Sequence, residues 1–80
     1  MWYVYVLKSL RNGRHYTGST DDLQRRFLEH NKGKTPSTQY NGPYKIVYQE
    51  EVDTRLAAPR RERFLKSGQG REYLKQIEGG

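Results

Sequence analysis

Cysteine is absent from this sequence of 80 residues. The absence excludes a disulfide framework, a zinc site built on thiolates and a thiol nucleophile, so no covalent link supports this small chain. Long apolar runs are also missing, since none approaches the roughly 18 residues that a transmembrane helix requires. The first residues, Met1 to Val6, are strand-like and do not follow the pattern of an export signal. We therefore expect a cytoplasmic protein that forms one domain over residues 1–80 and does not enter a membrane.

Large aliphatic side chains are scarce as well. Leu, Ile, Val and Phe together make up 15 of the 80 residues, close to the level at which a highly charged chain stays disordered. Seven Tyr and one Trp argue against disorder, because each can bury about 150–250 Å² and because they occur in patterned runs. We therefore predict a core that is built mainly from aromatic side chains.

Acidic residues are few relative to basic ones. Nine Asp and Glu stand against 15 Lys and Arg, which gives a net charge of +6 at pH 7. Such an excess favours a polyanionic partner, because contacts to phosphates supply most of the non-specific affinity for nucleic acids. Ribosomal proteins and proteins that bind membrane surfaces share this charge. The charge therefore indicates a class of partner and not an activity.

The residue pattern predicts three strands and three helices. Residues 2–7 are all apolar or aromatic, so we expect a strand that is buried on both faces. Asn12-Gly13 predicts a type I′ hairpin turn, in which both residues have positive φ. The expected strands are 2–7, 15–18 and 44–50, and the expected helices are 20–31, 54–67 and 71–77.

Particular residues set the expected ends of these helices. Thr20 can cap the first helix, and Gly33 can end it. The second helix begins at Asp53 or Thr54 in this prediction. Pro59 would delete a main-chain hydrogen bond if the helix begins at Thr54, which leaves its first turn open. The run Gly68-Gln69-Gly70 predicts a break before the last helix.

The first helix carries an apolar stripe with one arginine at its edge. At about 100° per residue, Leu23, Phe27 and His30 fall on one side of the helix. Arg26 lies beside His30 at the edge of this stripe, whereas Arg25 points toward solvent. Arg26 can therefore lie against the sheet, either as a functional cation or as an ordinary half-buried ion pair.

On the second helix, Glu62 lies on the flank of an apolar face that includes Leu65. Taken alone, Glu62 reads as a surface pair with Lys66 four residues later, a contact worth about 0.3–0.5 kcal/mol. The tyrosines and the two histidines have equally ordinary readings as packing and surface residues. The order in which these residues occur along the chain favours a functional interpretation instead.

Four short motifs follow one another along the chain, the second beginning eleven residues after Tyr5. In this order they resemble the GIY-YIG nuclease family, most closely its small stand-alone bacterial members, over residues 2–74. Tyr3 replaces the first glycine of the family name, and Ser19 stands where some members carry a lysine. The motifs are Tyr3-Val4-Tyr5, Tyr16-Thr17-Gly18, Asp22-Leu23-Gln24-Arg25-Arg26-Phe27 with His30-Asn31, and Arg61-Glu62-Arg63-Phe64-Leu65-Lys66.

The resemblance implies a fold and an activity. The fold is of the α/β class in its α+β form, with a three-stranded antiparallel sheet flanked by helices in the order β-β-α-β-α-α, which agrees with the element order above. The activity is hydrolysis of a phosphodiester bond. Carried over residue by residue, the implied catalytic residues are Tyr5, Tyr16, Arg26, Glu62 and, with a less uniform role in the family, His30.

Each of these residue types suits one part of the reaction. Glu62 would bind Mg²⁺ or Mn²⁺, because one carboxylate with several waters is an ordinary magnesium site. Arg26 would stabilise the transition state on the phosphate with a bidentate geometry that lysine lacks. Tyr16 would act as the base if positive charge lowers its ordinary pKa of about 10, and Tyr5 would orient the water or Tyr16. Which of the two tyrosines is the base stays open from the sequence. His30 would supply a hydrogen bond or a second proton relay.

Basic residues outside this set could contact the nucleic-acid backbone. Two of them precede the third strand, and three lie around the glycine break. Each also reads as an ordinary solvated surface charge. These residues are Lys32, Lys34, Lys66, Arg71 and Lys75.

Three functions follow from these observations. The first is a metal-dependent endonuclease that cuts flexible or branched DNA in repair or recombination, with RNA still open as a substrate. The second is a non-catalytic nucleic-acid-binding module. The third, a structural ribosome-associated protein, rests on charge alone. Product formation that depends on Mg²⁺ or Mn²⁺ separates the first from the second, and we expect a monomer or a weak homodimer that binds DNA.

Overall fold

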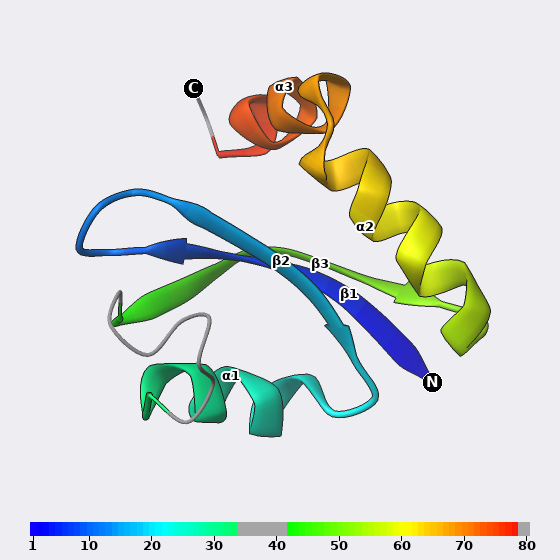
Figure 1. Ribbon diagram of the computed structural model, residues 1–80, viewed down its shortest axis with the longest axis horizontal. Helices are drawn as coiled ribbons and strands as arrows, with labels where there is room; N and C mark the ends of the chain where they lie inside the picture. Colours follow the sequence, from blue (N-terminus) through cyan, green and yellow to red (C-terminus); the bar gives the residue numbers. More distant parts are fainter. Residues whose placement is uncertain (34–41, 79–80) are drawn as a thin grey trace.

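The computed structural model describes residues 1–33 and 42–78 (Figure 1). Its elements follow the predicted order β-β-α-β-α-α, with one additional short 3₁₀ helix before the second α-helix. No helix in the described ranges is long and apolar enough to cross a membrane. The elements are β1 (Trp2–Ser9), β2 (His15–Thr20), α1 (Leu23–Asn31), β3 (Tyr44–Val52), η1 (Arg55–Ala57), α2 (Ala58–Lys66) and α3 (Gly68–Ile77).

β1 is the central strand of an antiparallel sheet with the strand order β2-β1-β3. Its residues from Val4 to Leu7 are at most 1% exposed, which confirms the prediction of a strand buried on both faces. β2 and β3 are therefore the two edge strands. The register of the hairpin pairs Tyr5 of β1 with Gly18 of β2.

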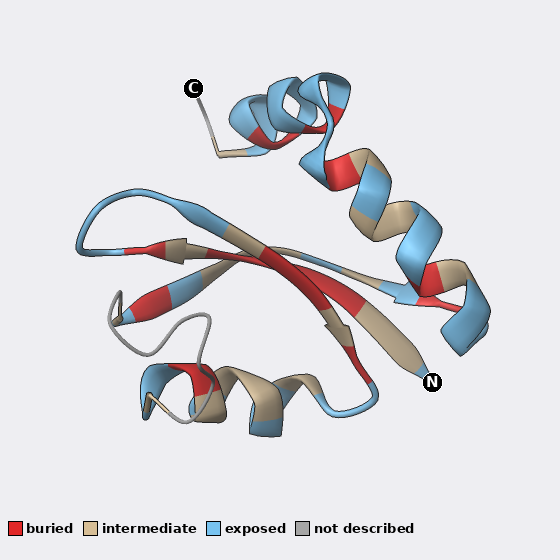
Figure 2. Ribbon diagram, viewed as in Figure 1, coloured by how far each residue is buried: buried red, intermediate tan, exposed pale blue. Residues whose placement is uncertain are grey.

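Different helices cover the two faces of the sheet. In Figure 1, α1 lies on one side of the strands, and α2 and α3 lie on the other. Figure 2 shows that burial is concentrated along β1 and at a few positions of each helix. The core on the α1 side is rich in aromatic residues and contains Tyr5, Leu7 and Tyr44, with Tyr16, Leu23, Phe27 and Ile46 packed against them.

The core on the side of α2 and α3 has a different composition. Its buried residues are all aliphatic, and Trp2, Tyr48 and Phe64 pack around them while partly exposed. The prediction of a mainly aromatic core is therefore wrong for this face. Two helices close over it, so that small side chains are enough to exclude water. The buried residues are Val4, Val6, Val52, Ala58, Leu65 and Leu74.

The loop between β1 and β2 is not the predicted type I′ turn. Among the described residues only glycines have positive φ, so Gly13 (φ 77°) adopts the expected conformation and Asn12 does not. The buried Ser9 organises the loop instead. Its amide donates to the Arg14 carbonyl at 2.8 Å, and its hydroxyl accepts from the amides of Arg11 and Asn12 at 3.1 Å. These hydrogen bonds satisfy the backbone amides of the turn while Asn12 keeps a negative φ.

The N-terminus of α1 differs from the prediction by two residues. Asp22 is the N-cap, and its carboxylate accepts from the amide of Arg25 at 3.1 Å. Thr20, the predicted cap, accepts from the amide of Asp22 at 3.1 Å and so shapes the turn that precedes the helix. The helix ends at Asn31 as predicted, and Gly33 follows with φ 75°.

The start of α2 resolves the difficulty posed by Pro59. Residues 55–57 form η1, and α2 begins at Ala58, so the predicted start at Thr54 is wrong. Pro59 then falls in the first turn of α2, where an amide has no acceptor within the helix. Proline therefore removes no hydrogen bond at this position.

The predicted break at Gly68-Gln69-Gly70 is also wrong, because these residues form the first turn of α3. Ser67 caps the helix, and its hydroxyl accepts from the amide of Gly70 at 3.2 Å. A β-carbon on Gly70 would lie 2.1 Å from the carbonyl oxygen of Phe64 and 2.6 Å from the Cα of Leu65. Glycine is needed here because the backbones of α2 and α3 approach each other, not because the helix stops.

Candidate active site

Four of the five predicted catalytic residues lie on the α1 side of the sheet. Tyr5 of β1 and Tyr16 of β2 face the buried His30 of α1. The Tyr5 hydroxyl lies 2.9 Å from His30 Nε2, and the rings of Tyr16 and His30 are 4.9 Å apart between centroids. Tyr44 also packs its ring against His30, at 6.5 Å. The family resemblance implies Tyr5, Tyr16 and His30 as members of one site, but residue spacing does not indicate that Tyr44 joins them, because it is far from the others in the chain.

Gly18 makes room for the hydroxyl of Tyr5. The two residues are paired across β1 and β2, so their side-chain positions face the same way. A β-carbon at Gly18 would lie 2.6 Å from the Tyr5 hydroxyl oxygen, well inside van der Waals contact. The glycine of the second motif therefore allows the tyrosine of the first motif to reach His30.

The protonation states of Tyr5 and His30 agree with this hydrogen bond. Burial raises the pKa of Tyr5 to about 12, although a hydrogen bond from Arg26 acts in the opposite direction. Tyr5 therefore keeps its proton near neutral pH. Burial and, after it, the charge of Arg26 lower the pKa of His30. A neutral imidazole can accept at Nε2 the proton that Tyr5 donates.

Arg26 lies against the sheet, and Arg25 does not. Arg26 is half-buried, whereas Arg25 is exposed and forms an outer pair with Asp21 at 3.5 Å. The choice of Arg26 from the helical pattern is therefore confirmed for its position. Arg26 also donates from Nη1 to Glu29 at 3.1 Å, so the ion pair considered from the sequence is present too. Glu29 was not among the residues predicted from the sequence, although its position three residues after Arg26 on one helix is a spacing that indicates such a pair.

Glu62 lies on the other face of the edge strand β2. The hydroxyl of Ser19 donates to Glu62 Oε2 at 2.9 Å. Ser19 follows Gly18 and so faces α2, because neighbouring residues of a strand point to opposite faces. No ion pair joins Glu62 to Lys66 within the part of the chain that the structure describes. Ser19, noted in the sequence only for the absence of a lysine, is thus the residue that fixes this carboxylate.

The charge of Glu62 nevertheless influences Tyr5. It is among the weaker influences that raise the pKa of Tyr5, after burial. The structure therefore brings Tyr5, Tyr16, Arg26 and His30 into one cluster and places Glu62 beside it, across one strand. No direct contact joins Glu62 to the cluster among the described residues.

An ion pair between α2 and β3 holds the helix that carries Glu62. Arg61 donates from Nε and Nη2 to the two carboxylate oxygens of Glu50, at 2.9 and 2.8 Å. Tyr48 hydrogen-bonds the same carboxylate, and the Arg61 guanidinium stacks on the ring of Phe64 at 4.8 Å. The bidentate geometry fixes the rotation of α2, which keeps Glu62 directed toward β2.

Comparison with known proteins decides the family. The family model of the GIY-YIG catalytic domain matches residues 1–75. The chain belongs to the GIY-YIG family. The family assignment predicted from the four motifs is therefore confirmed, together with the predicted fold.

Relatives of this GIY-YIG protein extend over almost all of its length. It is 35% identical over 79 residues to a UPF0213 protein of Staphylococcus saprophyticus, which covers 98% of this chain and 95% of the relative. It is 39% identical over 67 residues to a UPF0213 protein of Clostridium perfringens, and this match covers 82% of this chain and 71% of the relative. The solution NMR structure of a UPF0213 protein from Bacillus halodurans matches with a TM-score of 0.56 and 34% identity, over 100% of this chain and 88% of that one.

GIY-YIG nucleases generally use divalent metal ions. Among the described residues, no group of three or more His, Cys, Asp or Glu side chains could hold one. The donor that is present is the carboxylate of Glu62, whose Oε2 is bound by Ser19. Magnesium tolerates one carboxylate ligand when waters and phosphate oxygens complete its shell, so Glu62 fits this ion and does not fit a transition metal that needs several nitrogen or sulfur ligands.

The predicted backbone-binding cations separate into two groups. Lys66 and Arg71 line one pocket at the junction of α2 and α3. Lys32, at the C-cap of α1, and Lys75, in the last turn of α3, are exposed and do not line it. Lys34 lies outside the described residues.

Acidification is expected to destabilise the protein through His30. The unfolded chain binds a proton at the ordinary histidine pKa of about 6.5, whereas burial lowers the pKa of His30 in the fold. The contribution of neutral His30 to the free energy of unfolding is therefore complete above about pH 6.5. It is lost as the pH falls toward the lower pKa of the folded state, by at most about 1.4 kcal/mol per pH unit. Urea unfolding between about pH 5 and pH 7.5 measures this slope.

The matched variant for this measurement is His30→Gln. Its side-chain amide can still accept a hydrogen bond from Tyr5 but takes up no proton in this range. We expect a shallower dependence of the unfolding free energy on pH in the variant. Equal slopes in the two proteins would show that His30 does not carry the effect.

Proposed function

We propose that this protein is a metal-dependent endonuclease that hydrolyses phosphodiester bonds of DNA. One observation carries the proposal: a tyrosine pair and Arg26 meet on one face of the edge strand β2, while Glu62 is held on its other face. These groups supply a proton acceptor, a cation and a metal ligand around a single strand. They are the components that phosphodiester hydrolysis requires.

Tyr16 is the base in this proposal, and Tyr5 is a positioning residue. Tyr5 is 1% exposed, has a pKa raised to about 12 and is hydrogen-bonded to a buried histidine, so it is poorly placed to take a proton from water. Tyr16 is only half-buried and lies next to the same histidine ring. Through its bond to Tyr5, His30 keeps the tyrosine pair in place beside Gly18.

Arg26 binds the phosphate that is cleaved. Its contact with Glu29 uses Nη1, and a guanidinium has further donors in the same plane. A phosphate can therefore bind Arg26 together with Glu29, or it can displace Glu29 from Arg26. The planar fork then stabilises charge that develops on the phosphate oxygens in the transition state.

Glu62 is the protein ligand for the divalent ion. Ser19 binds one of its two oxygens, which fixes the carboxylate while the other oxygen keeps capacity for a metal. When bound, Mg²⁺ or Mn²⁺ supplies a Lewis acid that neutralises charge on the phosphate.

Removal of divalent ions is expected to abolish cleavage. The test incubates the purified protein with plasmid, single-stranded, flapped and junction DNA and with RNA, each in Mg²⁺, Mn²⁺, Ca²⁺ or EDTA. We expect cut product with Mg²⁺ or Mn²⁺, none with EDTA, and recovery after excess Mg²⁺ is added back. Preference for flapped or junction DNA would support a role in repair or recombination.

The same panel can defeat the proposal. If the protein binds DNA with equal affinity in EDTA and in Mg²⁺ and no substrate is cut with any ion, it is a nucleic-acid-binding module. Product that forms equally well in EDTA would exclude the metal while retaining a nuclease.

A further inference from the structure

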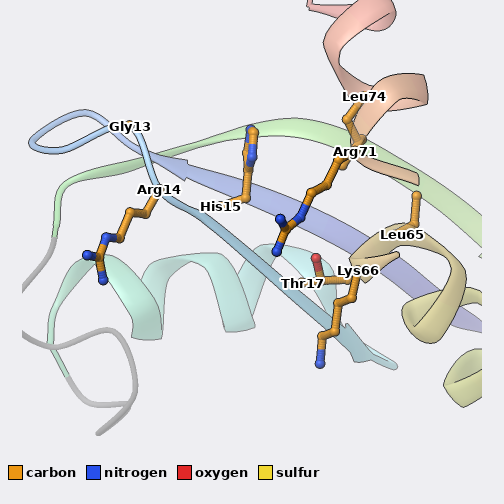
Figure 3. Close-up of a pocket in the computed structure, with 8 residues that line it drawn as sticks. All are labelled: Gly13, Arg14, His15, Thr17, Leu65, Lys66, Arg71 and Leu74. Atoms are coloured by element: carbon orange, nitrogen blue, oxygen red, sulfur yellow. The ribbon is translucent and has the colours of Figure 1, made fainter. Parts of the chain in front are cut away.

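A second polar site lies next to Glu62, in a pocket between the β1–β2 hairpin and the junction of α2 with α3 (Figure 3). Its volume is about 340 Å³. Leu65 and Leu74 contribute its apolar wall. We call it the basic pocket, and its polar lining consists of Arg14, His15, Thr17, Lys66 and Arg71.

Three cations of the basic pocket, Arg14, Lys66 and Arg71, have no ion-pair partner among the described residues. No Asp or Glu lines the pocket among the described residues, and no ion pair there involves Arg14, Lys66 or Arg71. Elsewhere in the described ranges, basic side chains such as Arg61 do find carboxylates. His15 belongs to this paired group, because it contacts Glu78 at 3.0 Å. The pocket therefore gathers three basic side chains that form no ion pair in the described ranges.

The head groups in the pocket are arranged for a small anion. Figure 3 shows the Arg71 side chain extending from α3 to beside the hydroxyl of Thr17. Lys66 leaves the end of α2 next to Thr17 with its ammonium directed away from that hydroxyl, and Arg14 points away from both. A guanidinium, an ammonium and a hydroxyl are all hydrogen-bond donors to phosphate oxygens. The described lining contains no Tyr, Trp or Phe. Its charged donors suit the oxygens of a phosphate.

The pocket is adjacent to the candidate metal ligand. Lys66 follows Glu62 by four residues on α2, a little over one turn or about 6 Å along the helix. Lys66 also lines the neighbouring hollow that contains Glu62. A strand whose phosphate lies at Glu62 therefore has its next phosphates within reach of Lys66 and Arg71.

We propose that the basic pocket binds a backbone phosphate of the nucleic-acid strand, next to the phosphate that lies at Glu62. Lys66 and Arg71 form the charged contacts, and Thr17 donates a hydrogen bond. The position of this phosphate relative to the cut rests on the proposed function, but binding in the pocket does not require cleavage. The contact is independent of base sequence, because phosphates carry no sequence information.

The test measures binding of a fluorescent DNA oligonucleotide in EDTA at several salt concentrations. The double variant Lys66→Ala/Arg71→Ala is compared with the parent protein and with Lys45→Ala/Arg60→Ala, which removes the same charge from exposed residues outside the pocket. We expect the pocket variant to bind about tenfold more weakly or worse. Its slope of log Kd against log salt should fall by about 0.9 for duplex DNA, the contribution of one lost phosphate.

The control and the conservative variant decide between a built site and diffuse charge. Lys45→Ala/Arg60→Ala should change the affinity less than threefold, and Lys66→Arg should bind as the parent does. If pocket and control variants weaken binding equally, or if neither changes it, the basic pocket is not a phosphate site. Thermal unfolding of each variant shows whether the fold is retained.

Failure of this inference differs from failure of the proposed function. A protein that binds DNA through the pocket but cuts nothing in any ion loses the nuclease proposal and keeps the phosphate site. If the protein cuts DNA but the pocket variant binds and cuts as the parent does, the nuclease proposal stands and the phosphate site is excluded.

Discussion

Glutamine in place of Glu62 is expected to lower the cleavage rate by about 10³-fold. The amide oxygen of the introduced glutamine can still accept the hydrogen bond from Ser19, so the substitution removes the charge and leaves the local contact. A neutral amide is a much weaker ligand for Mg²⁺ than a carboxylate. The measurement is the rate of nicking of plasmid DNA at saturating Mg²⁺, together with unfolding free energies of both proteins.

The matched control for this variant is Glu72→Gln. Glu72 is an exposed residue of α3, and the same chemical change there should leave the rate within about twofold of the parent. Because Glu62 is only half-buried, its replacement should alter the unfolding free energy by no more than about 1 kcal/mol. Cleavage by Glu62→Gln at the rate of the parent would remove this residue from the site.

Alanine in place of Gly70 is expected to destabilise the protein by about 3 kcal/mol or more. The added β-carbon would lie 2.1 Å from the Phe64 carbonyl oxygen and 2.6 Å from the Cα of Leu65. Both are backbone atoms of α2, so neither can rotate away, and the two helices must separate. For a chain of this size the loss corresponds to a fall in Tm of roughly 12–24 °C, measured by circular dichroism.

Gly68→Ala provides the contrast on the same turn. A β-carbon on Gly68 meets no atom within 4 Å, and alanine restricts the unfolded chain more than glycine does. This variant should be as stable as the parent or more stable by up to about 1 kcal/mol. If both alanine variants unfold at the temperature of the parent, α2 and α3 do not approach as closely as described.

The order of the elements was predictable because each has a signal within a few residues. The run of apolar and aromatic residues in β1 reports its burial, and the helical spacing of Leu23, Phe27 and His30 reports which face of α1 meets the sheet. The same spacing distinguishes Arg26 from Arg25. Local patterns of this kind depend on neighbours one or two turns away.

The ends of the elements were less predictable, because several residues could perform the same local task. Thr20 and Asp22 can both cap α1, and the register of the turn selects Asp22. Ser67 caps α3 and so brings Gly68 and Gly70 into a helix that glycine alone would not favour. In the hairpin, the buried hydroxyl of Ser9 accepts a hydrogen bond from the amide of Asn12, and Asn12 does not adopt the positive φ that was expected of it.

The partners within the candidate site were not predictable from spacing. Tyr5 and His30 are 25 residues apart, and Ser19 and Glu62 are 43 residues apart. Family resemblance indicates which residue types belong to the site, but only the packing of α1 and α2 on β2 shows that Ser19 holds Glu62. The pairing of Glu29 with Arg26 and the position of Arg14 in the basic pocket likewise become visible only in the folded structure.

The edge strand β2 also makes the two halves of the candidate site inseparable. Tyr16 and Gly18 face α1, whereas Thr17 and Ser19 face α2. A slip of the hairpin by one residue would therefore exchange the two sets at once and move the proposed base Tyr16, Gly18 and the serine that holds Glu62 to the wrong faces of the sheet. The length of the loop between Ser9 and His15 thus determines which side chains of β2 face α1 and which face α2, although no loop residue belongs to the proposed site.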